Sequence, residues 1–442
     1  MKRRVAIVGG GWAGLAAAVQ VCAQGHAVTL FEASRQWGGR ARRLHGGADD
    51  PLDNGQHILI GGYRDTLQLM ARVGVSPAEV LHPLPLDLRF ADGSGLAVPA
   101  WARHWPAPLD LLAAIGSARG WRLGERVALL RATLRWRWQG FRCAPGHSVA
   151  DLCQGLPARV IHDMLEPLCL AALNTPMTQA SAAVFLRVLQ DALLGPGHGA
   201  WRASTLLLPR VPLGAVLPEA ATRWLQARGA TLLLGERVQA LQPGAPGWQV
   251  ISGAAQPHSR SQPFDTVILA CPAAEAARLC ADLDLASARQ WAASAAALRH
   301  EPIATVYLQV PAHQPWPGRE PMLALRTEGE PAAAQFAFDR GRLGGPAGCW
   351  ALVCSSGSTD RAALSRQALQ QAATQLGAPS AQVLATVVEK RATFACTPAL
   401  QRPAMGVAPG LLAAGDYTEG PYPATLEGAV RSGLQAAQQL QR

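Results

Sequence analysis

The fold of this chain is constrained most by three glycines near its start: Gly9, Gly11 and Gly14. They lie between residues 4–8, whose apolar run predicts a strand, and residues 15–23, whose apolar spacing predicts a helix. Residues 27–31 predict a second strand. Glycines at this spacing let the chain turn tightly and let its backbone approach a pyrophosphate at the helix N-terminus. The sequence therefore predicts a β-α-β unit that binds a dinucleotide.

Two charged residues after this unit favour FAD as the dinucleotide. Glu32 ends the second strand, where its carboxylate can accept hydrogen bonds from ribose hydroxyls. Arg40 follows two glycines a few residues later and can neutralise the cofactor phosphates. A solvated loop arginine is the alternative for Arg40, because the chain is rich in this residue.

A second segment that suits a flavin lies near the C-terminus. Gly415 and Asp416 follow an apolar strand at residues 411–414, and a helix is predicted from about residue 424. The aspartate can bond the ribityl chain, and the N-terminus of the helix can direct its dipole at the flavin. Two segments from distant parts of the sequence therefore fit the same cofactor.

Between these two segments, one further stretch is predicted to belong to the same domain as the first β-α-β unit. The stretch from Leu206 onward predicts a helix that ends near residue 228, and apolar strands follow at residues 231–234 and 238–241. A buried strand is predicted at residues 265–270. The intervening stretches differ in character, because the first is proline-rich and then helical and the second contains strand-like runs.

The expected fold class is therefore α/β: a doubly wound, Rossmann-like FAD-binding domain with an inserted α+β substrate domain. The FAD-binding domain is expected to be discontinuous and to consist of residues 1–84, 206–275 and 401–442. The substrate-binding domain is expected to consist of residues 85–205 and 276–400.

Composition narrows the class of protein. The 442 residues are enough for two domains, and the content of 49% hydrophobic and 16% charged residues excludes a disordered chain. No window offers the roughly 18 uninterrupted apolar residues of a spanning helix, and no signal peptide is evident, so a cytoplasmic protein is expected. The nine cysteines are scattered without a Cys-x-x-Cys pair, so neither a disulfide framework nor a metal site is predicted.

The net charge of +10 comes from arginine, because only Lys2 and Lys390 are lysines. Two explanations stay open: the codon bias of a GC-rich genome, and a basic surface that contacts an anionic membrane peripherally. Residues 109–141 place Leu, Ile, Val and Trp at helical spacing among six arginines, which suits lipid contact, while core-facing helices with solvated arginines are the alternative. These arginines are Arg119, Arg122, Arg126, Arg131, Arg135 and Arg137. Nucleic acid is not expected as a partner, since no nucleic-acid motif is present.

Four separated motifs together resemble the superfamily of flavin amine oxidases and phytoene desaturases. They are the Gly9 to Gly14 turn, Gly38-Gly39-Arg40, the strand Val267 to Pro272, and Gly415-Asp416. Three further segments are similar to its squalene-associated branch, the hydroxysqualene dehydroxylases. They are Asp53-Asn54-Gly55-Gln56-His57, residues 166–176, and Pro423-Ala424-Thr425-Leu426-Glu427-Gly428. The resemblance extends over nearly the whole chain.

This resemblance implies an FAD-dependent enzyme that removes the allylic hydroxyl of hydroxysqualene to give squalene, in bacterial squalene and hopanoid synthesis. Such a reaction needs a proton donor, a dry apolar tunnel for the isoprenoid, and a hydride from the reduced flavin. Only one glycine-rich turn is present, so an external electron donor is expected. Two alternatives stay open: an isoprenoid desaturase or amine oxidase relative working in the oxidative direction, and a non-catalytic flavoprotein that carries an isoprenoid.

The resemblance also implies which residues form the site. His57 is the candidate proton donor, with Asp53 orienting it and Gln56 beside it, because residues 53–58 would pass beside the flavin ring. The alternative for His57 is a histidine that only bonds cofactor or backbone, and the alternative for Asp53 is an aspartate that only caps the loop. The cofactor-binding residues are expected to be Gly9, Gly11, Ala13, Gly14, Glu32, Ala33, Gly39, Arg40, Gly55, Gln56, Val238, Gly415, Asp416 and Leu426.

Five other residues are weaker candidates. Tyr417, Tyr422 and Glu427 belong to the C-terminal segment, and Glu427 is expected to be a carboxylate at a helix start. Glu166 and Asn174 are expected to shape the substrate tunnel rather than to react.

Overall fold

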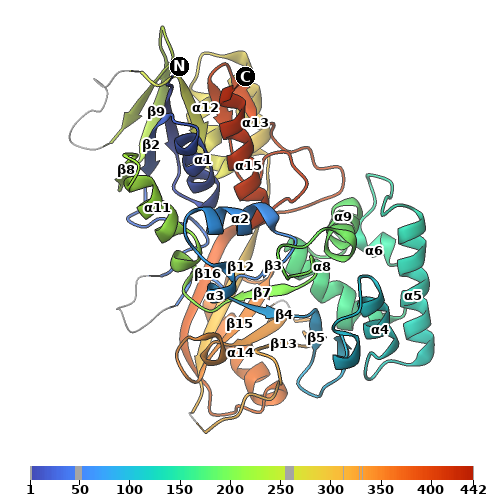
Figure 1. Ribbon diagram of the computed structural model, residues 1–442. Helices are drawn as coiled ribbons and strands as arrows, with labels where there is room; N and C mark the ends of the chain where they lie inside the picture. Colours follow the sequence, from blue (N-terminus) through green and yellow to red (C-terminus); the bar gives the residue numbers. More distant parts are fainter. Residues whose placement is uncertain are drawn as a thin grey trace.

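The computed structural model describes residues 2–44, 52–253, 263–311, 313–327, 329–330 and 332–441. Its two largest sheets lie at opposite ends of the molecule, and a group of helices extends to one side of them (Figure 1). The first sheet carries the glycine-rich turn, and the second faces the segment 53–57.

The first sheet has six strands drawn from three separate stretches of the chain. In spatial order they are β17 (Gly406–Ala408), β18 (Leu411–Ala413), β11 (Thr266–Leu269), β1 (Arg4–Val8), β2 (Ala27–Glu32) and β8 (Thr231–Leu234). All neighbours from β18 to β8 are parallel, and β17 adds an antiparallel edge. Parallel strands need crossover connections, which the helices between them supply.

Both faces of this sheet are buried, because successive side chains of a strand point to opposite sides. Val5 and Ile7 of β1 pack with three helices: α1 (Trp12–Ala23), α11 (Pro218–Gln226) and α15 (Leu426–Gln438). Ala6 and Val8 belong to the core on the other side, which includes α12 (Ala273–Ala281) and α13 (Ala286–Ala296). The predicted doubly wound α/β architecture is confirmed.

The second sheet is antiparallel throughout. In spatial order its strands are β13 (Met322–Ala324), β14 (Phe336–Asp339), β15 (Cys349–Ser355), β12 (His300–Gln309) and β16 (Gln382–Phe394). Helix α14 (Arg361–Gln375) packs on one face, where Val306 and Leu308 of β12 are buried. Tyr307 alternates with them and lies on the opposite face, toward residues 53–57.

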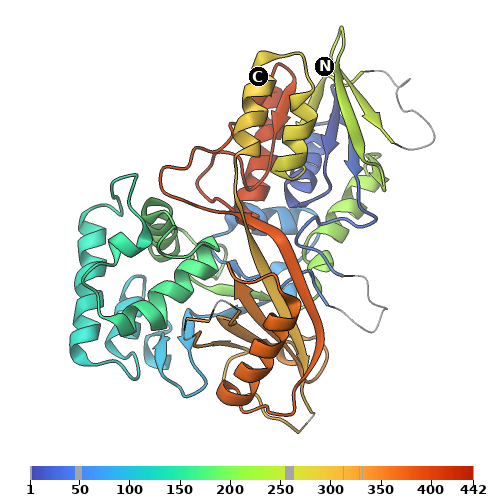
Figure 2. The ribbon, with the colours of Figure 1, turned by 180° about the vertical axis from the view of Figure 1, so that it is seen from behind.

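The helical region lies beside the second sheet. It contains α4 (Leu109–Gly116), α5 (Leu123–Trp138), α6 (Val149–Leu152), α7 (Ala158–Val160), a π-helical turn (Ile161–Leu165), α8 (Glu166–Leu173) and α9 (Ala182–Leu194). Figures 1 and 2 both place α5 at the outer edge of this region, far from the six-stranded sheet. Among the described residues, no helix combines the length and the apolar character needed to cross a bilayer.

Smaller elements connect these parts. One small sheet pairs β3 (Leu59–Ile60) with β7 (Leu206–Pro209) and β4 (Leu81–Leu84), and two hairpins pair β5 (Asp87–Arg89) with β6 (Gly95–Ala97) and β9 (Val238–Pro243) with β10 (Trp248–Ser252). The short helices are α2 (Arg64–Arg72), α3 (Pro77–Val80) and α10 (Leu213–Val216), with 3-10 turns at Ala100–Ala102, Gly341–Leu343 and Gln439–Gln441.

Two expectations need revision at the level of elements. The helix expected from Leu206 onward is wrong at its start, because Leu206–Pro209 is strand β7 and pairs with β3 and β4. Its apolar run fits a buried strand as well as a helix, and the partners are remote in the sequence. The expected domain boundary at 275 falls inside α12, so we propose that it lies between α13 and β12; the other boundaries stay predictions.

Candidate functional site

The glycine-rich turn leaves the start of α1 open. Gly9 has a φ of +113°, and a Cβ on Gly14 would lie 1.8 Å from the Gly9 carbonyl oxygen, so both positions require glycine. A Cβ on Gly11 would meet only the Gly39 Cα, at 3.8 Å. No side chain caps this end of α1, and its first turn contains no acid. Backbone N–H groups and the positive end of the helix dipole are therefore available to an anion.

Glu32 lies beside this turn, as predicted for a ribose ligand. Its Oε2 accepts a hydrogen bond from Gly10 N at 2.7 Å, and its Oε1 accepts one from Ser34 N at 2.7 Å. Each carboxylate oxygen has a further lone pair, so Glu32 can also accept from hydroxyls. The backbone N–H of Glu236 donates to the Glu32 carbonyl at 2.9 Å and brings the segment before Val238 to the same place.

Arg40 and Asp416 meet directly. The Arg40 Nη2 donates to the Asp416 Oδ1 at 2.5 Å, and the Arg40 Nη1 donates to the Ala392 carbonyl. Burial opposes the charge of Arg40, but the Asp416 carboxylate outweighs burial and raises the pKa of Arg40. Arg40 is therefore a positioned cation and not a freely solvated loop residue.

The other expected cofactor residues lie at the ends of strands and helices. Ala13 lies in the first turn of α1, Ala33 follows Glu32, Val238 begins β9, and Leu426 begins α15. Gly415 donates its backbone N–H to Ser432 Oγ of α15 at 2.8 Å. Residues from the start and the end of the sequence thus lie at the carboxyl ends of β1, β2 and β18, and the Glu236–Glu32 contact brings the segment before β9 to the end of β2.

Asp53 does not orient His57, so that expectation is wrong. Its carboxylate accepts a hydrogen bond from Leu213 N at 2.9 Å and lies 3.6 Å from the Arg340 Nη2. Burial raises the pKa of Asp53 to about 6, although Leu213 and Arg340 act in the opposite direction. The Asp53 carboxylate therefore binds the first N–H group of α10 and forms a buried ion pair with Arg340.

His57 is oriented by the backbone instead. Its Nδ1 lies 3.0 Å from the Gly55 carbonyl oxygen. A carbonyl only accepts, so Nδ1 carries the hydrogen and Nε2 is the free ring nitrogen. Burial lowers the pKa of His57, and Arg40 lowers it further. The imidazole is therefore mostly neutral at pH 7.

Three side chains in or directly after strands of the second sheet hold residues 53–57: Thr305, Tyr307 and Arg340. No sequence pattern pointed to them. The Arg340 Nη1 donates to the Gln56 Oε1 at 3.0 Å, so one buried guanidinium bridges Gln56 and Asp53. Tyr307 Oη donates to the Asp53 carbonyl at 3.0 Å, and Gln56 N donates to Thr305 Oγ1 at 3.4 Å. These contacts cross more than 240 residues of sequence, which is why no local pattern announces them.

Residues 424–428 of the C-terminal segment are held by hydrogen bonds and include one strained backbone position. Thr425 Oγ1 accepts from Gly428 N at 2.9 Å and caps α15, and Ala424 has a φ of +56°, which is strained for a residue with a Cβ. Glu427 is fully buried in the first turn of α15, the helix start that was expected for it. Its carboxylate also holds the start of α2, where it accepts from Thr66 N at 3.0 Å and from Asp65 N at 3.1 Å.

The remaining weaker candidates have structural contacts. Tyr417 is buried with no hydrogen-bond partner for its hydroxyl among the described residues. Asn174 ends α8 with a φ of +44° and donates to Thr393 Oγ1 of β16 at 2.9 Å, so it ties the helical region to the second sheet. Glu166, the first residue of α8, contacts His162 Nδ1 of the preceding π-helical turn at 3.1 Å.

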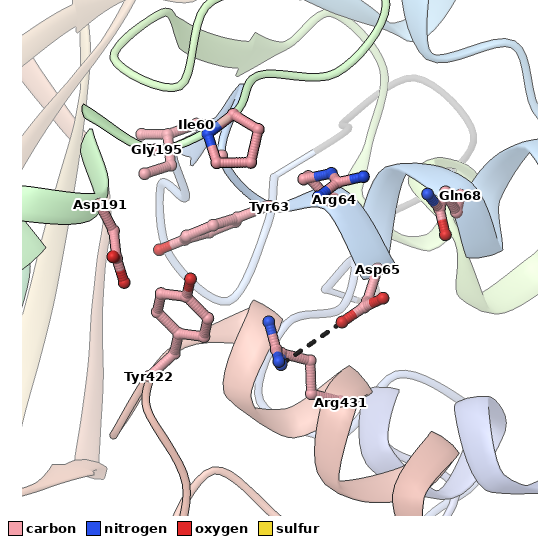
Figure 3. Close-up of a pocket in the computed structure, with 11 residues that line it drawn as sticks. Ile60, Tyr63, Arg64, Asp65, Gln68, Asp191, Gly195, Tyr422 and Arg431 are labelled. Carbon is pink, nitrogen blue, oxygen red and sulfur yellow. Dashed lines mark ion pairs between the residues drawn. The ribbon is translucent and has the colours of Figure 1, made fainter. Parts of the chain in front are cut away.

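A polar cavity of about 310 Å³ opens beside the C-terminal segment. Figure 3 shows the hydroxyls of Tyr63 and Tyr422 directed toward Asp191. Asp65 lies 3.4 Å from Arg431 of α15 in the same cavity. Burial raises the pKa of Tyr63, so this phenol is protonated at physiological pH. Tyr422 connects this cavity to the C-terminal segment, because its carbonyl oxygen accepts a hydrogen bond from Thr425 Oγ1 at 3.0 Å.

A second, apolar cavity lies inside the helical region. Its volume of about 40 Å³ is far smaller than a squalene-sized hydrocarbon. Helices α4, α5, α8 and α9 line it through side chains that include Leu111, Ile115, Trp136, Leu168, Leu189 and Leu193. Only Thr133 contributes a polar side chain, so the cavity favours hydrocarbon over water.

The sequence profile of the flavin containing amine oxidoreductases matches residues 12–441. This chain belongs to that family. Membership implies a flavin cofactor. The open glycine turn offers an anion site, Glu32 offers hydrogen-bond acceptors, and Arg40 and Asp416 form a charged pair. The alternative of a non-catalytic carrier has no support from the family.

Curated relatives narrow the comparison. The chain is 28% identical to the hydroxysqualene dehydroxylase of Rhodopseudomonas palustris over 452 residues, covering 99% of this chain and 98% of that protein. It is also 28% identical to the hydroxysqualene dehydroxylase of Sinorhizobium fredii, with the same coverage. The zeta-carotene desaturase of Synechocystis is 41% identical, but over only 71 residues, which are 16% of this chain and 14% of that protein.

Solved structures agree on the fold. An oxidoreductase from Methanosarcina mazei superposes with a TM-score of 0.69 at 16% identity, covering 99% of this chain and all of that one. Cyclohexylamine oxidase from Brevibacterium oxydans gives 0.67 at 17% identity over the full length of both chains. At these identities the likeness concerns the arrangement of sheets and helices alone.

Proposed function

We propose that this flavin oxidoreductase removes the allylic hydroxyl of hydroxysqualene to give squalene. The observation that carries the proposal is the full-length similarity to hydroxysqualene dehydroxylases, which covers 99% of the chain. The similarity to carotene desaturases stops after 16% of the chain and does not extend over the second sheet and the helical region together. A match of that length leaves most of the chain without a counterpart, so the oxidative alternative is the weaker one.

In this proposal the FAD is held by the gathered residues. The first turn of α1 would hold the pyrophosphate, Glu32 would accept hydrogen bonds from the ribose hydroxyls, and Arg40 and Asp416 would bind the phosphates and the ribityl chain. The start of α15 would stabilise negative charge on the flavin ring through its dipole, although one of its N–H groups, that of Gly428, is already bonded to Thr425 Oγ1. When bound in its reduced form, FAD supplies the hydride that replaces the hydroxyl.

The reaction balances with one proton and one hydride. The carbon–oxygen bond breaks, the hydroxyl and the proton leave as water, and a carbon–hydrogen bond forms at the same allylic carbon. The two electrons come from an external reductant, since the described residues contain one glycine-rich β-α-β unit and no second one for a nicotinamide cofactor. We propose that a small reductant binds in the polar cavity beside Tyr422, whose volume is about 310 Å³.

His57 is proposed as the proton donor. With Nδ1–H bonded to Gly55, the Nε2 of the neutral ring can accept a hydrogen bond from the substrate hydroxyl, and the protonated ring can donate to the same oxygen. A lowered pKa makes the imidazolium a stronger acid and also a scarcer species at pH 7. The proposal therefore requires faster turnover at acidic pH.

The apolar cavity is proposed as the inner end of the substrate tunnel. Its lining is almost wholly hydrocarbon, and the helices around it must separate for a long isoprenoid to enter. Because α8 and α9 also carry Asn174 and the residues beside Tyr422, movement there is linked to the site.

A single anaerobic turnover tests the function. The flavin is reduced with dithionite, hydroxysqualene is added, and flavin absorbance is followed while the lipids are extracted. Stoichiometric squalene together with reoxidised flavin is expected. Unchanged hydroxysqualene with the flavin still reduced would refute the proposal, and conjugated products from saturated isoprenoids would then favour a desaturase.

A further inference from the structure

Helix α5 exposes apolar and basic side chains together on its outer side. Leu123, Leu134 and Trp138 are 75%, 57% and 89% exposed. Four arginines of the same helix and its N-terminal cap are exposed beside them: Arg122, Arg131, Arg135 and Arg137. We call these seven residues the α5 surface. The inner side of the helix buries Leu129, Ala132 and Trp136, so the exposed leucines and tryptophan are not needed for its packing.

The positive charge of this region is not neutralised locally. Residues 101–142 contain eight arginines and two acids, a net charge of +6 within a chain of +10. Both acids are engaged: Asp110 pairs with Arg202 at 2.6 Å, and Glu125 accepts from the backbone at the start of α5. Among the described residues, the four arginines of the α5 surface form no ion pair. They therefore present an uncompensated field to the solvent.

Exposed apolar side chains are concentrated in the same region. The described part of the chain exposes ten large hydrophobic side chains, and six of them lie between residues 101 and 138. Besides the three on α5, these are Trp101, Trp105 and Leu109, with the two indoles in edge contact at 4.9 Å. Clustering on this scale marks an interaction surface, whereas isolated exposed leucines would not.

We propose that the α5 surface docks on an anionic phospholipid bilayer. Leucine and tryptophan side chains enter the interfacial layer, while arginines extend to the lipid phosphates. Thr133 and Trp136 on the inner side of the same helix line the apolar cavity, so α5 separates that cavity from the bilayer. The inference deepens the proposed function, because a membrane is where a hydrocarbon substrate is dissolved, but its test does not depend on activity.

Charge favours lipid over a second copy of the chain as the occupant. A two-fold contact through the α5 surface would bring the same arginines against each other. Of the two acids of this region, Asp110 is in an ion pair and Glu125 accepts a backbone hydrogen bond. An anionic membrane instead attracts every arginine on the surface.

Vesicle sedimentation tests the inference with FAD-loaded protein. We expect binding to phosphatidylcholine vesicles that contain about 30 mol% phosphatidylglycerol, and little binding to phosphatidylcholine alone. The variant R131Q/R135Q/R137Q is expected to lower the partition coefficient by up to about 100-fold, since each arginine near an anionic surface contributes roughly fivefold. The variant L134S/W138S is expected to lower the partition coefficient by about tenfold at low salt. The same loss is expected at high salt, where the contribution of the arginines is screened.

The matched control removes the same charge elsewhere. Arg223 of α11 and Arg361 and Arg366 of α14 are exposed on helices away from α5 in Figure 1, so R223Q/R361Q/R366Q is expected to bind as the wild type does. Equal binding by the two arginine variants would overturn the inference. So would a wild-type protein that stays in the supernatant, or one that sediments as a dimer which L134S/W138S converts to a monomer. Binding without turnover would contradict only the proposed function.

Discussion

The guanidinium of Arg40 donates to the carboxylate of Asp416 at 2.5 Å, which joins two segments that are 376 residues apart in the sequence. Each segment was expected to hold a different part of the same cofactor. Their contact shows that the turn at Gly38 and Gly39, which follows β2, lies next to the C-terminal end of strand β18. A charged pair at that place can hold a phosphate on the arginine side and a hydroxyl on the aspartate side.

Replacing Arg40 with glutamine is expected to weaken FAD binding by about tenfold or more, because a charge-assisted hydrogen bond to phosphate is lost. Flavin absorbance per protein, measured after gel filtration, gives the result. Arg35→Gln is the matched control, since Arg35 is an exposed arginine of the same connection. Full flavin retention by Arg40→Gln would contradict the role assigned to Arg40.

Turnover is expected to rise as the pH falls below about 6.5, because the lowered pKa of His57 leaves little imidazolium at neutral pH. His57→Gln is expected to lower kcat by about 100-fold or more and to remove this rise. The measurement is kcat against pH with saturating hydroxysqualene, in parallel with flavin content. A variant that keeps the acidic rise would show that another group donates the proton.

The ion pair of Arg340 and Asp53 predicts that loss of Arg340 lowers the free energy of unfolding by an amount that depends on pH. Burial raises the pKa of Asp53 from 3.8 to about 6, so the fold gains from the protonated carboxyl at low pH and loses that contribution as the pH rises through about 6. In Arg340→Met the ionised carboxylate also lacks its partner. We therefore expect a loss of about 3 kcal/mol in the free energy of unfolding near pH 8 and a smaller loss near pH 5.

Urea unfolding of the flavin-loaded protein at several pH values measures this difference. Arg340→Met/Asp53→Asn is the control, because it removes the titrating group together with its partner. That double variant should show a loss that no longer grows with pH. A loss in Arg340→Met that is equal at pH 5 and pH 8 would mean that Asp53 is not the group that titrates.

Much of the fold could be predicted because its first domain is built from local patterns. Strands β1 and β8 begin and end where the apolar runs predicted, and Gly9 to Gly14 identify the crossover by a backbone requirement that is visible in the sequence. Parallel strands buried on both faces read as continuous apolar runs, so β11 was also recognisable. Strand β7 was missed because four apolar residues do not distinguish a buried strand from a helix.

Only the site residues whose roles follow from backbone geometry could be predicted from the sequence. Glycines and a strand-end carboxylate have a fixed meaning, whereas the partners of a buried side chain depend on packing between distant elements. Asp53 was expected to serve His57, its neighbour in the sequence, but the fold offers it the backbone of Leu213 and the guanidinium of Arg340. Arg340 is one of many arginines, and nothing in its local sequence marks it as a residue that crosses between domains.

The apolar cavity gives the last prediction, because its small volume makes it sensitive to added bulk. Leu189 of α9 lines it, and Leu189→Trp is expected to fill the space and raise KM for hydroxysqualene by about tenfold or more, with flavin content and dithionite reduction unchanged. Leu189→Met keeps the volume and should leave KM within about twofold of the wild type. If Leu189→Trp turns over hydroxysqualene with an unchanged KM, the isoprenoid does not pass through this cavity, and the tunnel must approach His57 along the second sheet instead.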